Sequence, residues 1–78
     1  MTDTATQQPI RVSDSLAGPY IRLPLASLER VRNLLRENHI PHWVEHHAIS
    51  VDGQPPVIVI NIGKTVDSRH VQELLDAA

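Results

Sequence analysis

The stretch Pro56 to Gly63, PVIVINIG, constrains the fold of this chain more than any other. Five of its six central residues are Val or Ile, and β-branched side chains favour a pleated sheet. Because the run is short and bounded by Pro and Gly, it predicts a strand rather than a helix. Apolar residues occupy both parities of the run, so both faces of this strand should be covered. We therefore expect 57–62 to be the central strand of a small sheet.

The length and composition predict one small domain. A chain of 78 residues without Cys or Phe has to build its core from Leu, Ile, Val and Ala. Because no disulfide or thiolate-bound metal reinforces that core, association with another chain is the remaining common source of buried area. We expect a disordered tail at 1–8 and a single α+β domain at 9–78.

The charge balance argues against two classes of partner. The net charge is −2, which gives no long-range attraction to nucleic acid or to an anionic membrane. The N-terminus has neither a basic start nor an apolar run, so no signal peptide is expected. The longest apolar stretch is too short to span a bilayer. These features predict a cytoplasmic protein.

Further strands and helices are predicted on either side of the central strand. Alternation predicts a strand at 20–23, and helical periodicity predicts helices at 26–37 and 68–76. The expected cap residues are Ser27 and Asp67 at the helix starts and Asn38, in a left-handed conformation, at the first helix end. Val66 and Val71 should form a hydrophobic staple at the second helix.

The strand expected at 42–51 has no clean alternation. We expect its core face to be the parity that begins at Trp43, because the bulkier apolar residues lie at the ends of that parity; this face comprises Trp43, Glu45, His47, Ile49 and Val51. An irregularity near His46 and His47 would let the phase switch. Asp52-Gly53 then predicts a turn into the central strand.

This order of elements, βαββα, predicts the topology. A strand, helix and strand in succession normally form a crossover with parallel strands. A hairpin from 42–51 to 57–62 then places the third strand between the first two, in the order 1-3-2. Both helices lie on one face, as in a ferredoxin-like layout that lacks its last strand. The free edge of 20–23 is left for residues 10–12 or for a second copy of the protein.

The sheet face opposite the helices has no covering layer in this arrangement. Exposed apolar sheet faces and free edges mark association sites. The expected interface consists of Tyr20, Arg22, Trp43, Val44, Val57 and Val59. For Trp43 two interpretations stay open, a core plug or an interface anchor.

The turn after the first helix supports a resemblance. Val31-Arg32-Asn33-Leu34-Leu35 is followed by a short turn and Ile40-Pro41, which is similar to small bacterial βαββα domains, both ACT-like domains and a signal-transducing family. The resemblance covers 20–77 and implies an α+β fold. Leu23-Pro24-Leu25-Ala26-Ser27 stands where the ACT pattern has its glycine turn, so no functional residue is carried over.

Histidines near the second strand are the most conspicuous chemical cluster. Imidazole and carboxylate side chains suit Zn²⁺, Ni²⁺ or Cu²⁺. Glu45 and His47 share one strand face at about 7 Å and are feasible as a pair of ligands, whereas His42 and His46 on the other face are too far apart for one ion without a bulge. Glu45, His46 and His47 are the candidate metal residues. The alternatives are a solvated polar strand and a pH-sensitive surface.

Enzymatic chemistry has no assembled motif in this sequence. The residues Ser27, Ser50, Ser68, Asp67 and His70 lack the spacing of a nucleophile, base and orienting group. Gly63-Lys64-Thr65 lacks the preceding glycine-rich stretch of a phosphate loop. The sequence therefore predicts a non-enzymatic interaction or regulatory module without a cofactor, acting as a homodimer or as a subunit of a complex. The alternative is a regulator that responds to a small ligand or metal through the histidine-rich strand.

Overall fold

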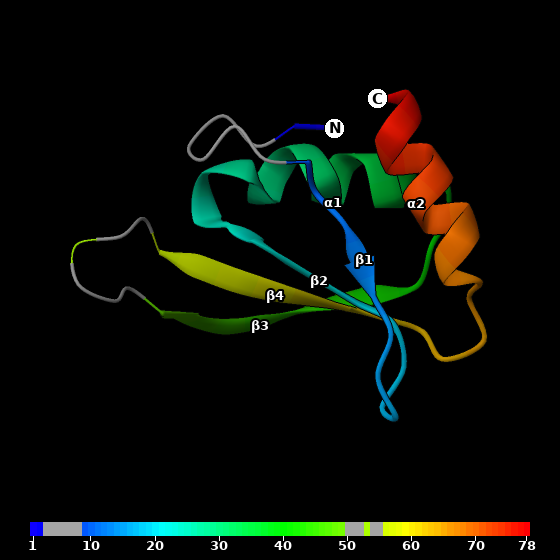
Figure 1. Ribbon diagram of the computed structural model, residues 1–78, viewed down its shortest axis with the longest axis horizontal. Coiled ribbons are helices and arrows are strands. Elements are labelled where there is room, and N and C mark those ends of the chain that lie inside the picture. Colours follow the sequence, from blue (N-terminus) through cyan, green and yellow to red (C-terminus); the bar gives the residue numbers. More distant parts are fainter. Residues whose placement is uncertain (3–8, 50–52, 54–55) are drawn as a thin grey trace.

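The computed structural model describes residues 1–2, 9–49, 53 and 56–78, with the side chains of 46–49 excepted (Figure 1). Within these residues the chain forms an α+β fold with two helices and a four-stranded antiparallel sheet. The elements in chain order are β1 (Val12–Ser13), β2 (Tyr20–Pro24), a short 3₁₀ turn (Leu25–Ser27), α1 (Leu28–Glu37), β3 (His42–Ile49), β4 (Val57–Ile62) and α2 (Ser68–Ala77).

Strand β4 lies inside the sheet, as its composition predicts. The strand order is β1-β2-β4-β3, and every neighbouring pair is antiparallel. Along β2 the register runs from Tyr20 opposite Asn61 to Pro24 opposite Val57. On the other side β3 pairs with β4 from His42 opposite Ile62. Since β2 and β3 are both antiparallel to β4, they run parallel to each other across it.

The prediction of three strands is wrong, because β1 adds a fourth at the edge of β2. Val12 pairs with Ile21 and Ser13 with Tyr20. Of the two occupants expected for this edge, the N-terminal segment of the same chain is the one present. Ile10 is buried just before β1, which anchors this segment in the core. The extra strand therefore precedes β2 in the chain, whereas the strand missing from the ferredoxin-like layout would follow α2.

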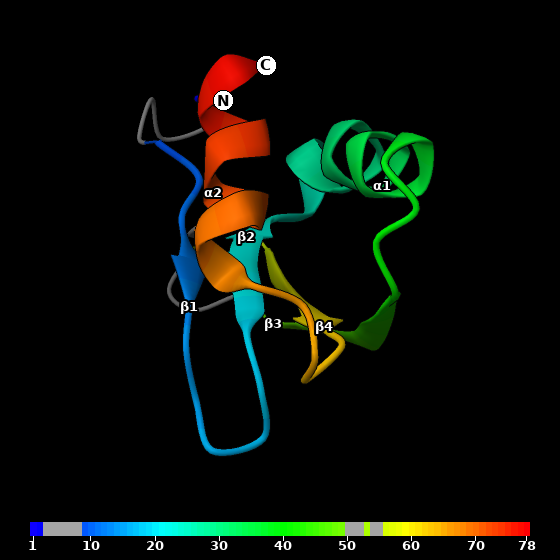
Figure 2. The ribbon, with the colours of Figure 1, turned by 90° about the vertical axis from the view of Figure 1, so that its right-hand side faces the viewer.

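Both helices cover the same face of the sheet (Figures 1 and 2). The even-numbered residues of β4 point at them, so Ile58, Ile60 and Ile62 are buried. The other parity of β4 is only half-buried, so the expectation that both faces of this strand are covered is wrong for the chain by itself. The core beneath the helices consists of Ile10, Ile21, Leu23, Val31, Leu35, Ile40, Ile58, Ile60, Ile62, Val71 and Leu75.

The cap predictions hold for α2 and fail in part for α1. Asp67 caps α2 by accepting a hydrogen bond from the Arg69 N–H at 2.9 Å. Ser27 precedes α1 but makes no side-chain capping bond. The left-handed residue is His39, with φ 56°, rather than Asn38. Asn38 instead donates its side-chain amide to the Leu34 carbonyl at 2.8 Å, which holds it in place one residue before the turn.

One side chain of α2 fastens β1 to the domain. The Gln72 Oε1 accepts a hydrogen bond from the Val12 N–H at 2.8 Å. Its Nε2 donates to the Ile10 carbonyl at 3.3 Å and to Asp76 Oδ1 at 3.0 Å. The Met1 amino group donates to the Leu75 carbonyl nearby. Because Gln72 satisfies backbone groups on the outer edge of β1, it takes the place of a further strand.

We expect Gln72→Ala to lower the free energy of unfolding by about 1–2 kcal/mol, because two half-buried hydrogen bonds to backbone are lost. Amide exchange at Val12 should accelerate more than exchange in β4. Chemical denaturation and hydrogen exchange measure both effects. Glu73→Ala, at the exposed neighbouring position, is the control and should leave both values near those of the wild type. Equal effects of the two substitutions would contradict this role.

Candidate functional site

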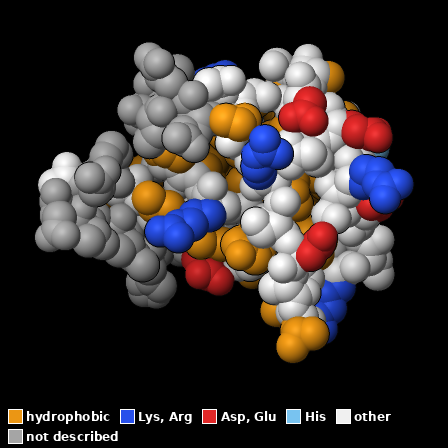
Figure 3. All heavy atoms as spheres, viewed as in Figure 1, with side chains coloured by type: hydrophobic (Ala, Val, Ile, Leu, Met, Phe, Trp, Pro, Cys, Tyr) orange, Lys and Arg blue, Asp and Glu red, His pale blue; other side chains and the backbone are white. Residues whose placement is uncertain are grey.

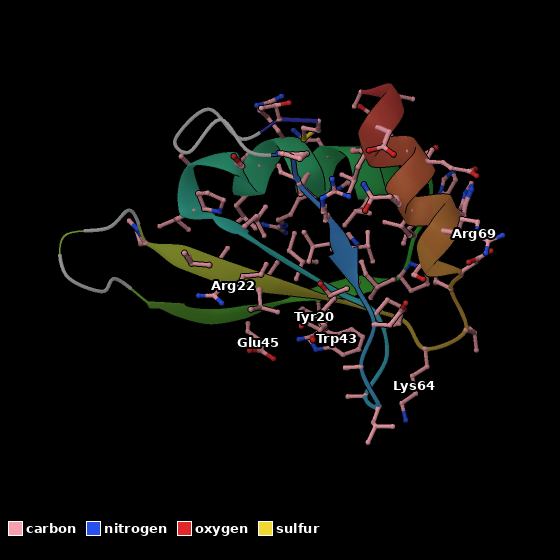
Figure 4. The ribbon with its side chains drawn as sticks, in the orientation of Figure 1. Tyr20, Arg22, Trp43, Glu45, Lys64 and Arg69 are labelled. Atoms are coloured by element: carbon pink, nitrogen blue, oxygen red, sulfur yellow. The ribbon has the colours of Figure 1, made fainter. Side chains whose placement is uncertain are left out.

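The side of the sheet that faces away from the helices is the candidate site. It carries alternate residues of three strands, which we call the open face: Tyr20 and Arg22 of β2, Val57, Val59 and Asn61 of β4, and Trp43 and Glu45 of β3. Figure 4 shows Tyr20, Arg22, Trp43 and Glu45 together on the side of the strands opposite α1 and α2. In the described part of the chain, no secondary structure lies over this face.

The pairing of β3 with β4 decides which β3 side chains belong to the open face. Val44 lies opposite Ile60, a core residue, so Val44 points at the helices and packs against the core. Trp43 lies opposite Asn61 and therefore points the other way. The predicted core face of this strand is thus wrong at Trp43 and Glu45. The prediction that Val44 belongs to the interface is also wrong, because Val44 lies on the core side of the sheet.

Trp43 is an exposed residue and not a core plug. Trp43 is 54% exposed, which makes it one of the exposed large hydrophobic residues in the described part of the chain. The sequence pattern predicts that Trp43 faces the core because it is large and apolar. Its orientation is instead set by the register of β3 with β4. The other predicted interface residues, Tyr20, Arg22, Val57 and Val59, lie with it on the open face, half-buried apart from the exposed Arg22.

Two rows of side chains cross the open face. One row is Tyr20, Asn61 and Trp43, and the next is Arg22, Val59 and Glu45. The rows are joined where the Asn61 Nδ2 donates to Glu45 Oε1 at 2.9 Å. This bond holds the carboxylate over the face and leaves its second oxygen able to accept. Among the described residues, the ion pair that is present joins Arg32 to Glu29 on α1, and Arg22 has no carboxylate partner.

Asn61 is the open-face residue that the sequence analysis did not assign to a site. In the sequence it is the single polar residue in the run from Val57 to Ile62. The sequence feature that indicates its position is its parity. Asn61 has the same parity as Val57 and Val59, and the three buried isoleucines have the other. A single polar residue on the uncovered parity of a central strand therefore indicates the solvent side of the sheet.

The predicted irregularity in β3 is present beside the candidate metal residues. Between Glu45 opposite Val59 and Ile49 opposite Val57, β3 advances four residues while β4 advances two. The side chains of His46 and His47 lie outside the described residues, so the metal hypothesis still rests on the sequence. Among the side chains that are described, no three His, Asp or Glu groups come close enough to hold a metal ion.

Most of the groups considered for catalysis are buried or have structural roles where the chain is described. Ser27 is fully buried and Asp67 caps α2. Ser68 donates its hydroxyl to Asp14 at 3.3 Å. The N–H of Gly63 donates to the Pro41 carbonyl at 3.0 Å, so it is not directed at a phosphate. Ser50 lies outside the described residues, and His70 is exposed on α2.

Charges of both signs are interspersed over the side of the molecule seen in Figure 3. Lys and Arg side chains there alternate with Asp and Glu side chains, and no extended region of one sign forms in the described surface of this view. A mixed surface of this kind favours short-range pairing over long-range attraction of a polyanion.

Among the described helices, α1 and α2 are each too short and too polar to cross a membrane.

Comparison of the chain with protein-family models, curated proteins and solved structures gives no match. The resemblance to ACT-like and signal-transducing domains therefore stays a prediction. The case for function rests on the open face and its residues.

The positions of Val44 and Trp43 can be tested by placing a carboxylate at each. Val44→Asp should lower the free energy of unfolding by about 2–4 kcal/mol, because it puts a charge against the core. Trp43→Asp should cost less, because position 43 already meets water. Urea denaturation followed by circular dichroism at low protein concentration measures both. The reverse order of the two effects would mean that Trp43, and not Val44, faces the core.

Proposed function

We propose that this chain is a non-enzymatic protein–protein interaction module that associates through the open face. The observation that carries the proposal is the exposure of Trp43 on a sheet face that no secondary structure of the described chain covers. Burying such a surface against another protein removes apolar area from water, which is the main driving force of association. The module would act as a homodimer or as a small subunit of a complex.

The composition of the open face supports binding. Trp, Tyr and Arg are the residue types most enriched where interfaces concentrate their binding energy. Trp43 and Tyr20 lie in one row of the open face, on either side of Asn61, and Arg22 lies in the next row. Val57 and Val59 supply a small apolar centre between the flanking strands. A central apolar strip with aromatic and charged groups beside it has the anatomy of an interface.

The other exposed apolar residues do not form a second surface of this kind. Among the described residues, the large exposed hydrophobic side chains are Leu16, Leu25 and Trp43. Leu16 lies in the turn between β1 and β2, and Leu25 begins the 3₁₀ turn before α1. Single exposed leucines are common on protein surfaces and need no functional explanation. Trp43 differs because its neighbours on the open face are half-buried apolar and polar groups.

We also infer that the part from β2 to α2 is a truncated ferredoxin-like unit. The order of its elements and the central place of β4 support this. In such a unit one helix layer covers one sheet face, and the other face is available for binding.

The proposal predicts that a carboxylate at the centre of the open face abolishes association. Val59→Asp puts an unpaired charge in the middle of the interface, which strongly disfavours burial against a partner. Leu16→Asp is the matched control, since it makes the same change at an exposed apolar residue on the β1–β2 turn. Sedimentation of the purified proteins measures self-association, and affinity capture with each protein as bait measures binding of others.

We expect self-association or capture by the wild type to be lost in Val59→Asp and retained in Leu16→Asp. Because Asp is unfavourable in a strand, circular dichroism must show that Val59→Asp is folded. Trp43→Ser, at the exposed position, is the second test variant and should also weaken association. A wild type that neither self-associates nor captures a protein in a manner sensitive to Val59→Asp would refute the proposed function.

A further inference from the structure

The charges of the open face are arranged with opposite signs on either side of β4. Arg22 of β2 and Glu45 of β3 both lie opposite Val59, one on each side of it. Two strand spacings separate their backbones, about 10 Å. Cation, apolar residue and anion thus form one straight row across the three strands. A partner surface that matches this row needs an anion, an apolar residue and a cation in the opposite order.

A second copy of the same chain supplies that order under one symmetry operation. Consider two open faces stacked against each other and related by a two-fold axis that runs parallel to β4 between them. This rotation places β2 of one copy over β3 of the other and leaves each β4 over its counterpart. Arg22 then meets Glu45 of the second copy, and Glu45 meets its Arg22. Val59 packs on Val59 at the centre, so the row is its own complement.

The other simple orientation is disfavoured by the same charges. A two-fold axis that runs across the strands would place β2 over β2 and β3 over β3. Arg22 would then face Arg22, and Glu45 would face Glu45. Like charges brought together in an interface are repulsive. The charge row therefore selects the axis parallel to β4.

The neighbouring row fits the same orientation. Tyr20 and Trp43 stand on opposite sides of Asn61, so the rotation places Tyr20 over Trp43 of the second copy. Aromatic side chains facing each other across an interface attract beyond their buried area. Both aromatic residues of the chain take part in these contacts. Asn61 retains its bond to Glu45, which fixes the carboxylate that Arg22 of the second copy would meet.

We propose that the open face binds a second copy of this chain in a symmetric dimer, in which Arg22 of each copy pairs with Glu45 of the other. This rests on the proposed function and names its partner. The two sheets stack about 10 Å apart with their strands within about 30° of each other, as in a β-sandwich. Because the open face carries only a few side chains, the interface is small, and we expect a dimer at the weak end of specific protein–protein complexes.

Charge reversal and mixing test the pairing between copies. Arg22→Glu and Glu45→Arg each turn two attractive contacts of the dimer into repulsive ones, so each should weaken dimerisation by roughly tenfold or more. Mixing the two variants forms a heterodimer in which both contacts are attractive again. Sedimentation velocity should therefore show two variants that are monomeric alone and dimeric together. A contact within one chain cannot produce this rescue.

Two further measurements complete the experiment. Arg30→Glu, the same substitution at an exposed position on α1, is the matched control and should dimerise like the wild type. Salt should weaken the wild-type dimer, because it screens the attraction between Arg22 and Glu45. In the orientation across the strands, salt would instead strengthen it by screening repulsion. Circular dichroism verifies that each variant is folded, which is expected because both positions are exposed.

The outcomes separate this proposal from the one on which it rests. A monomeric wild type would overturn the symmetric dimer, while capture of another protein that is sensitive to Val59→Asp would leave the proposed function standing. A dimer that is unaffected by either charge reversal would use another surface, such as the outer edge of β3, and would also overturn the pairing. Weakening without rescue in the mixture, or a dimer strengthened by salt, would refute the orientation.

Discussion

The structure depends on the pairing of β4 with a strand on each side. This pairing fixes the register of β2 and β3, and the register fixes which of their side chains face the helices. Ile58, Ile60 and Ile62 then form the floor of the core beneath α1 and α2. A single layer of two helices covers only one side of a sheet, so the other parity of β4 stays at the surface. The open face is therefore a direct consequence of how the core is built.

The two edges of the sheet differ in how their backbone groups are kept from pairing with a further strand. At one edge β1 is only two residues long, and Gln72 binds the backbone groups on its outer side. Short strands and covered backbone groups prevent edge-to-edge pairing. At the other edge β3 is eight residues long, with a register shift after Glu45. Such a shift disturbs regular pairing with a further strand. Both devices favour association through the face of the sheet over association through its edges.

The sequence predicts the parts of the fold that rest on clear periodicity. The dense run at 57–62, the apolar stripes of both helices and the cap at Asp67 all have the structures that their patterns indicate. It fails at β3, where neither parity is clean and the size of Trp43 favours the wrong one. The correct parity follows only from contact with β4, where Val44 meets Ile60. The burial of Ile10 is also non-local, because it depends on α2 packing against a segment some sixty residues away.

Arg22 and Glu45 invite a simpler explanation, in which charged residues merely interrupt an apolar face and keep it soluble. That role places no condition on sign, since two cations or two anions would serve it equally well. The observed arrangement has one sign on each side of β4, on the same row, with the carboxylate fixed by Asn61. Opposite signs at equivalent distances from a central strand are what a face needs to match its own two-fold image. The sign and placement of these charges therefore favour a recognition role over a purely protective one.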